Sequence, residues 1–304
     1  MKTIIQTACI LILMLSLNID SSAQTKTFEV LNPKVQQGDV LIVNIVPIFG
    51  LGVFPQPTIL FLNKQYYPNR YGDVFIGIDL NTKPGRYPVT LVDHGTGREL
   101  SPDYFVEVDI TDREFTSRTR GMFIPTLRRK RERDVINKAF GDGDYSDRYF
   151  KDEFVKPLDK IILDTDRKVG DISSPFGDGH AGVDLVTLDR KSGQNKRPVK
   201  AINSGKVALI AKNFSTDGNM VILDHGSGIF SVYMHLSSFK VKKVGDMVNK
   251  DDIIAISGNT GSAKRGGPHL HFAVKIRDKN KVSDVYVDPL AFIDTMNQYV
   301  KQTP

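Results

Sequence analysis

The chain has 304 residues, of which 40% are hydrophobic and 25% charged, which is typical of a globular protein with room for about two domains. Its 41 Lys and Arg residues outnumber 35 Asp and Glu residues, and the net charge of +6 suits an anionic partner. We expect no nucleic acid among the partners, because no recognition motif accompanies this charge. The chain shows neither internal repeats nor low-complexity segments.

Residues 1–23 have the pattern of a secretory signal peptide. Lys2 precedes an apolar stretch at about 4–17, and small residues up to Ala23 fit the cleavage positions. We therefore expect an exported protein, either periplasmic or extracellular and associated with the cell envelope. No other apolar run approaches the roughly 20 residues of a membrane span, so we expect no transmembrane segment in the mature chain. The only cysteine, Cys9, lies in this segment, which excludes a disulfide framework, a cysteine nucleophile and thiolate metal ligands.

Residues 24–112 contain six short apolar runs separated by turn sequences. The runs are TFEVL, DVLIVNIV, TILFLN, DVFIGIDL, RYPVTLVD and YFVEVDI. Strands at this spacing predict a small antiparallel β-sandwich. No cluster of catalytic residue types occurs here, so we expect this domain to bind, space or shield.

Residues 113–170 form a basic linker that we expect to contain one short helix. The segment LRRKRERDVINKAF has helix-forming residues throughout, with four apolar side chains available for one side, namely Leu127, Val135, Ile136 and Ala139. The basic residues are expected on a solvated face, and a contact patch for the envelope or a processing site are the alternatives. These residues are Arg128, Arg129, Lys130, Arg131 and Arg133.

Residues 171–304 carry the chemically informative motifs. In GGPHLHFAV, His269 and His271 are two apart, so on a strand they share a face and lie roughly 6.6 Å apart along it. In HAGVD, His180 and Asp184 would be roughly 13 Å apart on an extended strand, which is too far for one metal ion. The glycines around this segment and the preceding proline favour a bend over a helix.

Histidine with carboxylate is a ligand combination suited to a catalytic zinc ion. Two imidazole nitrogens and one carboxylate oxygen leave the fourth tetrahedral position open for water. Four histidines and one aspartate exceed the three ligands needed, which leaves two histidines for proton transfer. His235, in YMHL, is one of these, and the other is His269 or His271, which sequence spacing does not distinguish. His94 and His225 are expected to be ordinary surface or scaffold residues, and Tyr233 a packing residue that could line the site.

From about Ser173 to Ile293 the chain resembles the lysostaphin-like, LytM-type zinc endopeptidases, which cut peptide bonds in peptidoglycan. The resemblance is carried in order by SPFG, HAGVD, RPVKAINSGKV, GNMVILDHGSG, YMHL, VGDMVNKDDIIAISGNTG, GGPHLHF and VDPLAF. Residues 24–112 are similar to the immunoglobulin-like domain that precedes some peptidase domains of this family, chiefly through QQGDVLIV and IDLNTKPGRYPVTL. The expected fold is mainly β, with an immunoglobulin-like sandwich, a short helical linker and an antiparallel LytM-like zinc peptidase domain.

The resemblance implies that one zinc ion per chain is held by His180, Asp184 and His271, and that His235 and His269 are the catalytic pair. Peptidoglycan peptide stems are then the substrate. Cross-links between D-Ala and a diamino acid are favoured over glycine bridges, because the chain lacks wall-binding repeats. Only two residues separate SPFG from His180, fewer than in many relatives, so the rim of the groove is expected to differ. The alternative is a non-catalytic envelope factor that activates another wall hydrolase.

Overall fold

The computed structural model describes residues 28–45, 57–100, 105–113, 126–160, 168–177, 179–190 and 192–302. The predicted signal peptide lies outside the described residues. The described chain is mainly β, with few helices, as the sequence predicts.

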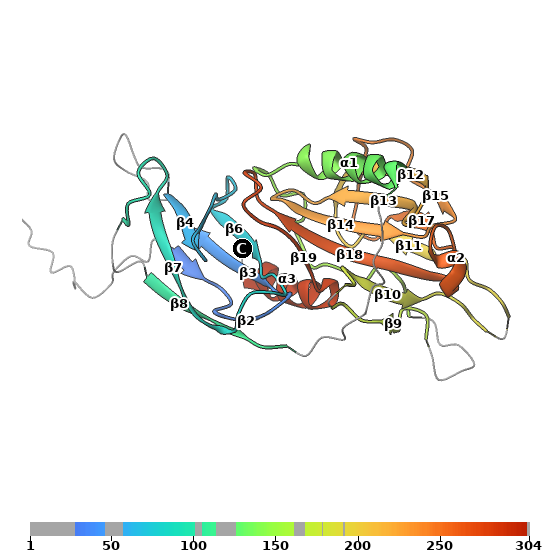
Figure 1. Ribbon diagram of the computed structural model, residues 1–304, viewed down its shortest axis with the longest axis horizontal. Coiled ribbons are helices and arrows are strands. Elements are labelled where there is room, and N and C mark those ends of the chain that lie inside the picture. Colours follow the sequence, from blue (N-terminus) through green and yellow to red (C-terminus); the bar gives the residue numbers. More distant parts are fainter. Residues whose placement is uncertain are drawn as a thin grey trace, which may run out of the picture.

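The N-terminal part consists of two sheets that share one core (Figure 1). The strand orders are β1–β3–β6 and β2–β8–β7–β4–β5. The strands are β1 (Phe28–Val30), β2 (Lys34–Gln36), β3 (Val40–Ile45), β4 (Pro57–Phe61), β5 (Lys64–Tyr66), β6 (Asp73–Gly77), β7 (Gly85–Asp93) and β8 (Phe105–Thr111). Each of the six predicted runs overlaps one of these strands, whereas β2 and β5 lie outside the predicted runs. The pairings are antiparallel except for β2 with β8, which is parallel.

The C-terminal part is built on one large antiparallel sheet and one small sheet. The large sheet has the order β16–β12–β13–β14–β18–β10–β9 with β19 paired to β18, and the small sheet is β11–β17–β15. The strands of the large sheet are β9 (Ile172–Ser174), β10 (Val183–Val186), β12 (Gly205–Phe214), β13 (Gly218–Asp224), β14 (Ile229–Met234), β16 (Met247–Val248), β18 (His269–Arg277) and β19 (Asp284–Val287). The small sheet contains β11 (Pro198–Lys200), β15 (Ser238–Phe239) and β17 (Ile253–Ile256).

The two parts are joined by a buried interface. Strand β3 is buried on both faces, because Leu41 packs inside the sandwich whereas Ile42 belongs to the large core of the C-terminal part. Helix α3 (Pro289–Gln302) lies at this junction (Figure 1), where the Tyr299 ring stands edge-on to Phe75 at 5.6 Å between centroids. The N-terminal sheets are thereby fixed at the end of the molecule remote from α2 (Ala263–Gly266).

Helix α1 (Leu127–Gly141) begins at Thr126, whose side chain accepts a hydrogen bond from the Arg129 amide. The predicted helix is present, but its predicted apolar side is wrong in part. Leu127 and Val135 are 78% and 45% exposed. The helix instead packs through Phe140, together with Ala139 and Ile136, because Phe140 fits against Phe230 of β14 at 5.1 Å between ring centroids.

Candidate metal centre and active site

Strand register brings distant parts of the sequence to one place. In the antiparallel pair of β10 and β18, Asp184 lies opposite His271 and Val186 lies opposite His269. Across the other edge of β18, His271 lies opposite Met234, the last residue of β14, and His235 follows directly. Residues paired in this way have Cβ atoms about 4.5–5.5 Å apart. The sheet therefore positions Asp184 and the histidines of β18 without help from a long loop.

His180 reaches the same place because the chain bends between it and Asp184. Gly177 and His180 form an isolated β-bridge, and the Gly182 amide donates to the His180 carbonyl at 2.8 Å. Gly179 has φ of +73°, in the left-handed region that favours glycine. The predicted bend is confirmed, and the segment is not helical.

His180, Asp184 and His271 each offer one ligand atom, and these atoms all lie within 4.8 Å of one another. Asp184 Oδ1 lies 3.1 Å from His180 Nε2 and 2.9 Å from His271 Nδ1. Ligand atoms around a tetrahedral zinc ion with bonds near 2 Å are about 3.3 Å apart. The two nitrogens and one oxygen therefore fit a zinc ion.

Backbone carbonyls fix the tautomers of three of the histidines. A carbonyl oxygen only accepts hydrogen bonds, so a ring nitrogen that contacts one must carry the proton, and the opposite nitrogen of the neutral ring keeps its lone pair. The contacts are His180 Nδ1 to Pro175 O at 2.6 Å, His235 Nδ1 to Thr260 O at 2.9 Å and His269 Nδ1 to Gly267 O at 2.9 Å. Each of these rings thus presents Nε2 for metal binding or proton transfer.

The electrostatics of Asp184 and His271 favour the protonation states that bind metal. Burial would raise the pKa of Asp184, but the contacts with His180 and His271 outweigh it and hold that pKa well below its ordinary value. Burial lowers the pKa of His271 despite its contact with Asp184. The carboxylate is therefore ionised and the His271 imidazole neutral at pH 7.

His235 is held in a strained conformation beside His269. Its φ of +64° is unusual for a residue with a side chain, and such strain persists where the surroundings over-determine it. Its amide donates to Asp217 O at 3.0 Å, and its ring centroid lies 4.8 Å from that of His269. Burial, followed by the neighbouring His269 and His271, lowers the pKa of His235 to about 4. His235 is therefore neutral at pH 7.

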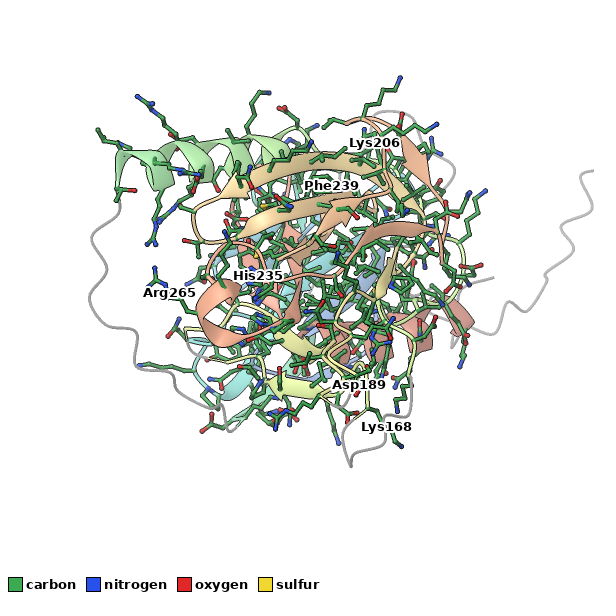
Figure 2. All side chains as sticks on the ribbon, turned by 90° about the vertical axis from the view of Figure 1, so that its right-hand side faces the viewer. Lys168, Asp189, Lys206, His235, Phe239 and Arg265 are labelled. Carbon is green, nitrogen blue, oxygen red and sulfur yellow. The ribbon has the colours of Figure 1, made fainter. Side chains whose placement is uncertain are left out.

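All five predicted site residues line one cavity of about 630 Å³. Figure 2 looks at this end of the molecule, with His235 lying inward of Arg265. Asp217 and Tyr286 also line the cavity and were missed by the sequence analysis. Asp217 sits in a polar turn, STDG, that looks like any β-hairpin connection, whereas Tyr286 directly precedes the VDPLAF motif and could have been found from it.

The other residues considered at the sequence level lie elsewhere. His225 is fully buried and contacts Ser204 O through Nδ1 at 2.8 Å, and His94 is exposed beside Tyr67. Tyr233 is fully buried and its hydroxyl accepts from the Ile202 amide at 3.1 Å, so it packs rather than lining the groove. No helix among the described residues combines the length and apolar character that a membrane crossing needs.

The site has the geometry of a metal centre, and comparison with known proteins points to the metallopeptidases. Residues 178–289 match the profile described as Peptidase family M23, so this part of the chain is similar to the domains of that family. The described part of the chain also resembles, at the level of the whole fold, the crystal structure of a Pseudomonas aeruginosa protein assigned to peptidase M23. The identity is 25% with a TM-score of 0.55, over 84% of this chain and 93% of that one, so the likeness extends into the N-terminal sheets.

Two curated relatives each match a part of the chain. Peptidoglycan DD-endopeptidase ShyA of Vibrio cholerae is 38% identical over 82 residues, which are 27% of this chain and 18% of ShyA. Lysostaphin of Staphylococcus staphylolyticus is 38% identical over 97 residues, which are 32% of this chain and 19% of lysostaphin. The chain thus spans about a fifth of the length of these relatives.

Proposed function

We propose that the chain is an exported zinc metalloendopeptidase that hydrolyses peptide bonds in peptidoglycan cross-links. The observation that carries this proposal is the cluster of three ligand atoms within 4.8 Å of one another, in the same cavity as the His235–His269 pair. The similarity to a peptidoglycan endopeptidase and to lysostaphin supports the substrate class. Cross-links between D-Ala and a diamino acid are the favoured bond.

The zinc ligands in this proposal are His180 Nε2, Asp184 Oδ1 and His271 Nδ1. The Nδ1 proton of His180 is committed to Pro175 O, which leaves Nε2 with its lone pair. Nδ1 of His271 faces Asp184, whereas its Nε2 lies toward Gly182. Bound there, zinc would activate a water molecule at neutral pH and polarise the carbonyl under attack.

His235 and His269 move the protons. Both rings are anchored through Nδ1 and present Nε2, so neither has to reorient before it acts. Because His235 is neutral at pH 7, its Nε2 can accept a proton from the attacking water. A ring that has taken up that proton carries an Nε2–H group, which can donate a hydrogen bond to the oxyanion and then return the proton to the leaving amine.

For the N-terminal part we propose an immunoglobulin-like sandwich that acts as a fixed arm rather than a shield. Among the described residues, none from its two sheets lines the cavity with the histidines. The sheets lie at the opposite end of the molecule (Figure 1) and are tied to the C-terminal part by the buried junction at α3. Such an arm can bind a partner or act as a spacer without covering the site.

The decisive experiment measures bound zinc and cleavage on the same preparation. Zinc is quantified by elemental mass spectrometry, and purified peptidoglycan is digested with and without chelator. Mass spectrometry of the released fragments identifies the bond. We expect one zinc per chain, chelator-sensitive cleavage and new amino termini on the diamino acid, with His94→Ala unchanged because His94 is exposed and remote from the site. One zinc per chain without any cleavage would instead support the non-catalytic factor.

A further inference from the structure

A second cavity continues the groove beyond the histidine pair. It has a volume of about 910 Å³, and its wall includes residues of α1 and α2. Both cavities are lined by Thr216, Asp217, Met234, Ser262 and Tyr286. The second cavity therefore adjoins the site, within reach of a peptide bound across His235 and His269.

The walls of this second cavity are basic. Arg129 and Arg133 are four residues apart on α1 and so share a face, and both line the cavity. Arg265 faces them from α2, and Figure 2 shows it on the same side of the molecule as α1. Among the described residues, no carboxylate lies within ion-pair distance of Arg133 or Arg265. The lysine in the wall, Lys275, is already paired with Asp284 at 2.9 Å.

The acidic residue between the two arginines is already engaged. Glu132 accepts from the Ser215 amide at 3.0 Å through both carboxylate oxygens, accepts from the Ser215 hydroxyl, and pairs with Arg128 at 2.9 Å. These contacts also clamp α1 to the turn between β12 and β13, next to Asp217. The helix is therefore a fixed wall of the groove, and Arg133 on it lines the second cavity.

We propose that Arg133 and Arg265 form a subsite for the carboxylates of an anionic peptide, next to the bond that is cleaved. Guanidinium groups bind carboxylates in a bidentate geometry that lysine does not reproduce. The subsite selects peptides with free carboxylates over uncharged glycine peptides or amidated stems. This inference rests on the proposed function, and it assigns peptides with free carboxylates to that site as the class of substrate.

The test uses the full chain and two matched fluorescent stem peptides in which D-Ala is joined to a diamino acid. Both peptides contain a glutamate and the diamino acid. The carboxylates of these two residues are free in one peptide and amidated in the other. The variant is Arg133→Gln with Arg265→Gln. Its matched control is Arg131→Gln with Lys264→Gln, which removes the same two charges from the same helices but at exposed positions outside both cavities.

In fluorescence anisotropy, the wild-type chain and the control are expected to bind the free peptide about tenfold more tightly than the amidated one, and the advantage shrinks as salt is added. The groove variant loses that advantage and leaves binding of the amidated peptide unchanged. Equal behaviour of the groove variant and the control would overturn the subsite. Peptidoglycan digestion is measured separately. Carboxylate-dependent binding without hydrolysis would contradict the proposed enzyme and support the subsite. Hydrolysis that does not depend on either arginine would support the enzyme and contradict the subsite.

Discussion

Gly182 is the position where one added methyl group should damage the metal site most directly. A Cβ atom built there would lie 2.6 Å from Phe272 O and 2.8 Å from His271 Nε2. Ordinary contact begins at 3.4 Å, so Gly182→Ala requires these atoms to retreat by about 0.8 and 0.6 Å. The first atom is backbone of the paired strand, and the second belongs to the ring of His271, whose Nδ1 is a proposed zinc ligand.

The size of this displacement sets the expected effect. Metal–ligand distances in a working site hold to within about 0.2 Å, so a shift of His271 of this size cannot be absorbed. We expect zinc affinity to fall by about 10- to 100-fold, as for the loss of a residue that orients a ligand. Overpacking of this kind costs roughly 1–3 kcal/mol of unfolding free energy, or several degrees in Tm, so the chain still folds.

The measurement is a zinc titration against a chromophoric chelator, with thermal melts of the metal-free proteins. Gly266→Ala is the matched control, because Gly266 lines the same cavity and an added Cβ there meets nothing within 4 Å. It should leave both zinc affinity and Tm unchanged. A Gly182→Ala protein that melts lower but binds zinc like the wild type would refute the reasoning, since the close approach would then not position His271.

Three further predictions follow from other parts of the molecule. His180→Ala should lose both zinc and activity. His235→Ala should keep zinc and lower kcat by about 10²- to 10⁴-fold, and loss of zinc from His235→Ala would show that the ligand assignment is wrong. Arg148→Ala leaves Asp73 buried without the guanidinium that pairs with it at 3.2 Å. The free energy of unfolding in urea should fall by roughly 2–3 kcal/mol, and an unchanged urea midpoint would contradict a role for this pair at the junction. Burial lowers the pKa of His225 from 6.5 to about 4, so below pH 6.5 the unfolded state takes up a proton that the folded state refuses. Relative to His225→Gln, the wild type should therefore lose up to roughly 3 kcal/mol of unfolding free energy as pH falls from 6.5 to 4, and none above pH 6.5. Curves of unfolding free energy against pH that run parallel for the two proteins would rule this out.

Local features of the sequence predicted much of the fold and of the site. Six of the eight N-terminal strands follow from short apolar runs between turns, and the bend after His180 follows from glycines that an extended strand would not need. The run VLIVNIV also indicates that its strand is buried on both faces, although the sequence analysis assigned it only to the sandwich. A strand that is apolar without alternation is buried on both faces, and β3 is one of the strands that join the two parts.

The position of α1 could not be predicted in the same way. Its basic residues were expected in solvent, because a run of five cations within six positions looks like a solvated face, and four of the five are indeed exposed. The face that turns inward is decided by Phe140 against Phe230 and by Glu132 against Ser215, which is 83 residues away in the sequence. Contacts of this kind are invisible to periodicity, and they convert part of a predicted linker into a wall of the groove.

The HLH motif shows where strand geometry goes beyond sequence spacing. Both histidines share a face of β18, and both approach Asp184 Oδ1, with His271 Nδ1 at 2.9 Å and His269 Nε2 at 3.6 Å. His271 lies directly opposite Asp184 in the register, whereas His269 lies two positions along, next to His235. The antiparallel pairing thus gives the two rings different neighbours, a carboxylate for His271 and an imidazole for His269. This difference favours His271 as the ligand, because its ring nitrogen lies within 4.8 Å of the ligand atoms of both His180 and Asp184. It leaves His269 beside His235, where the two rings can serve proton transfer.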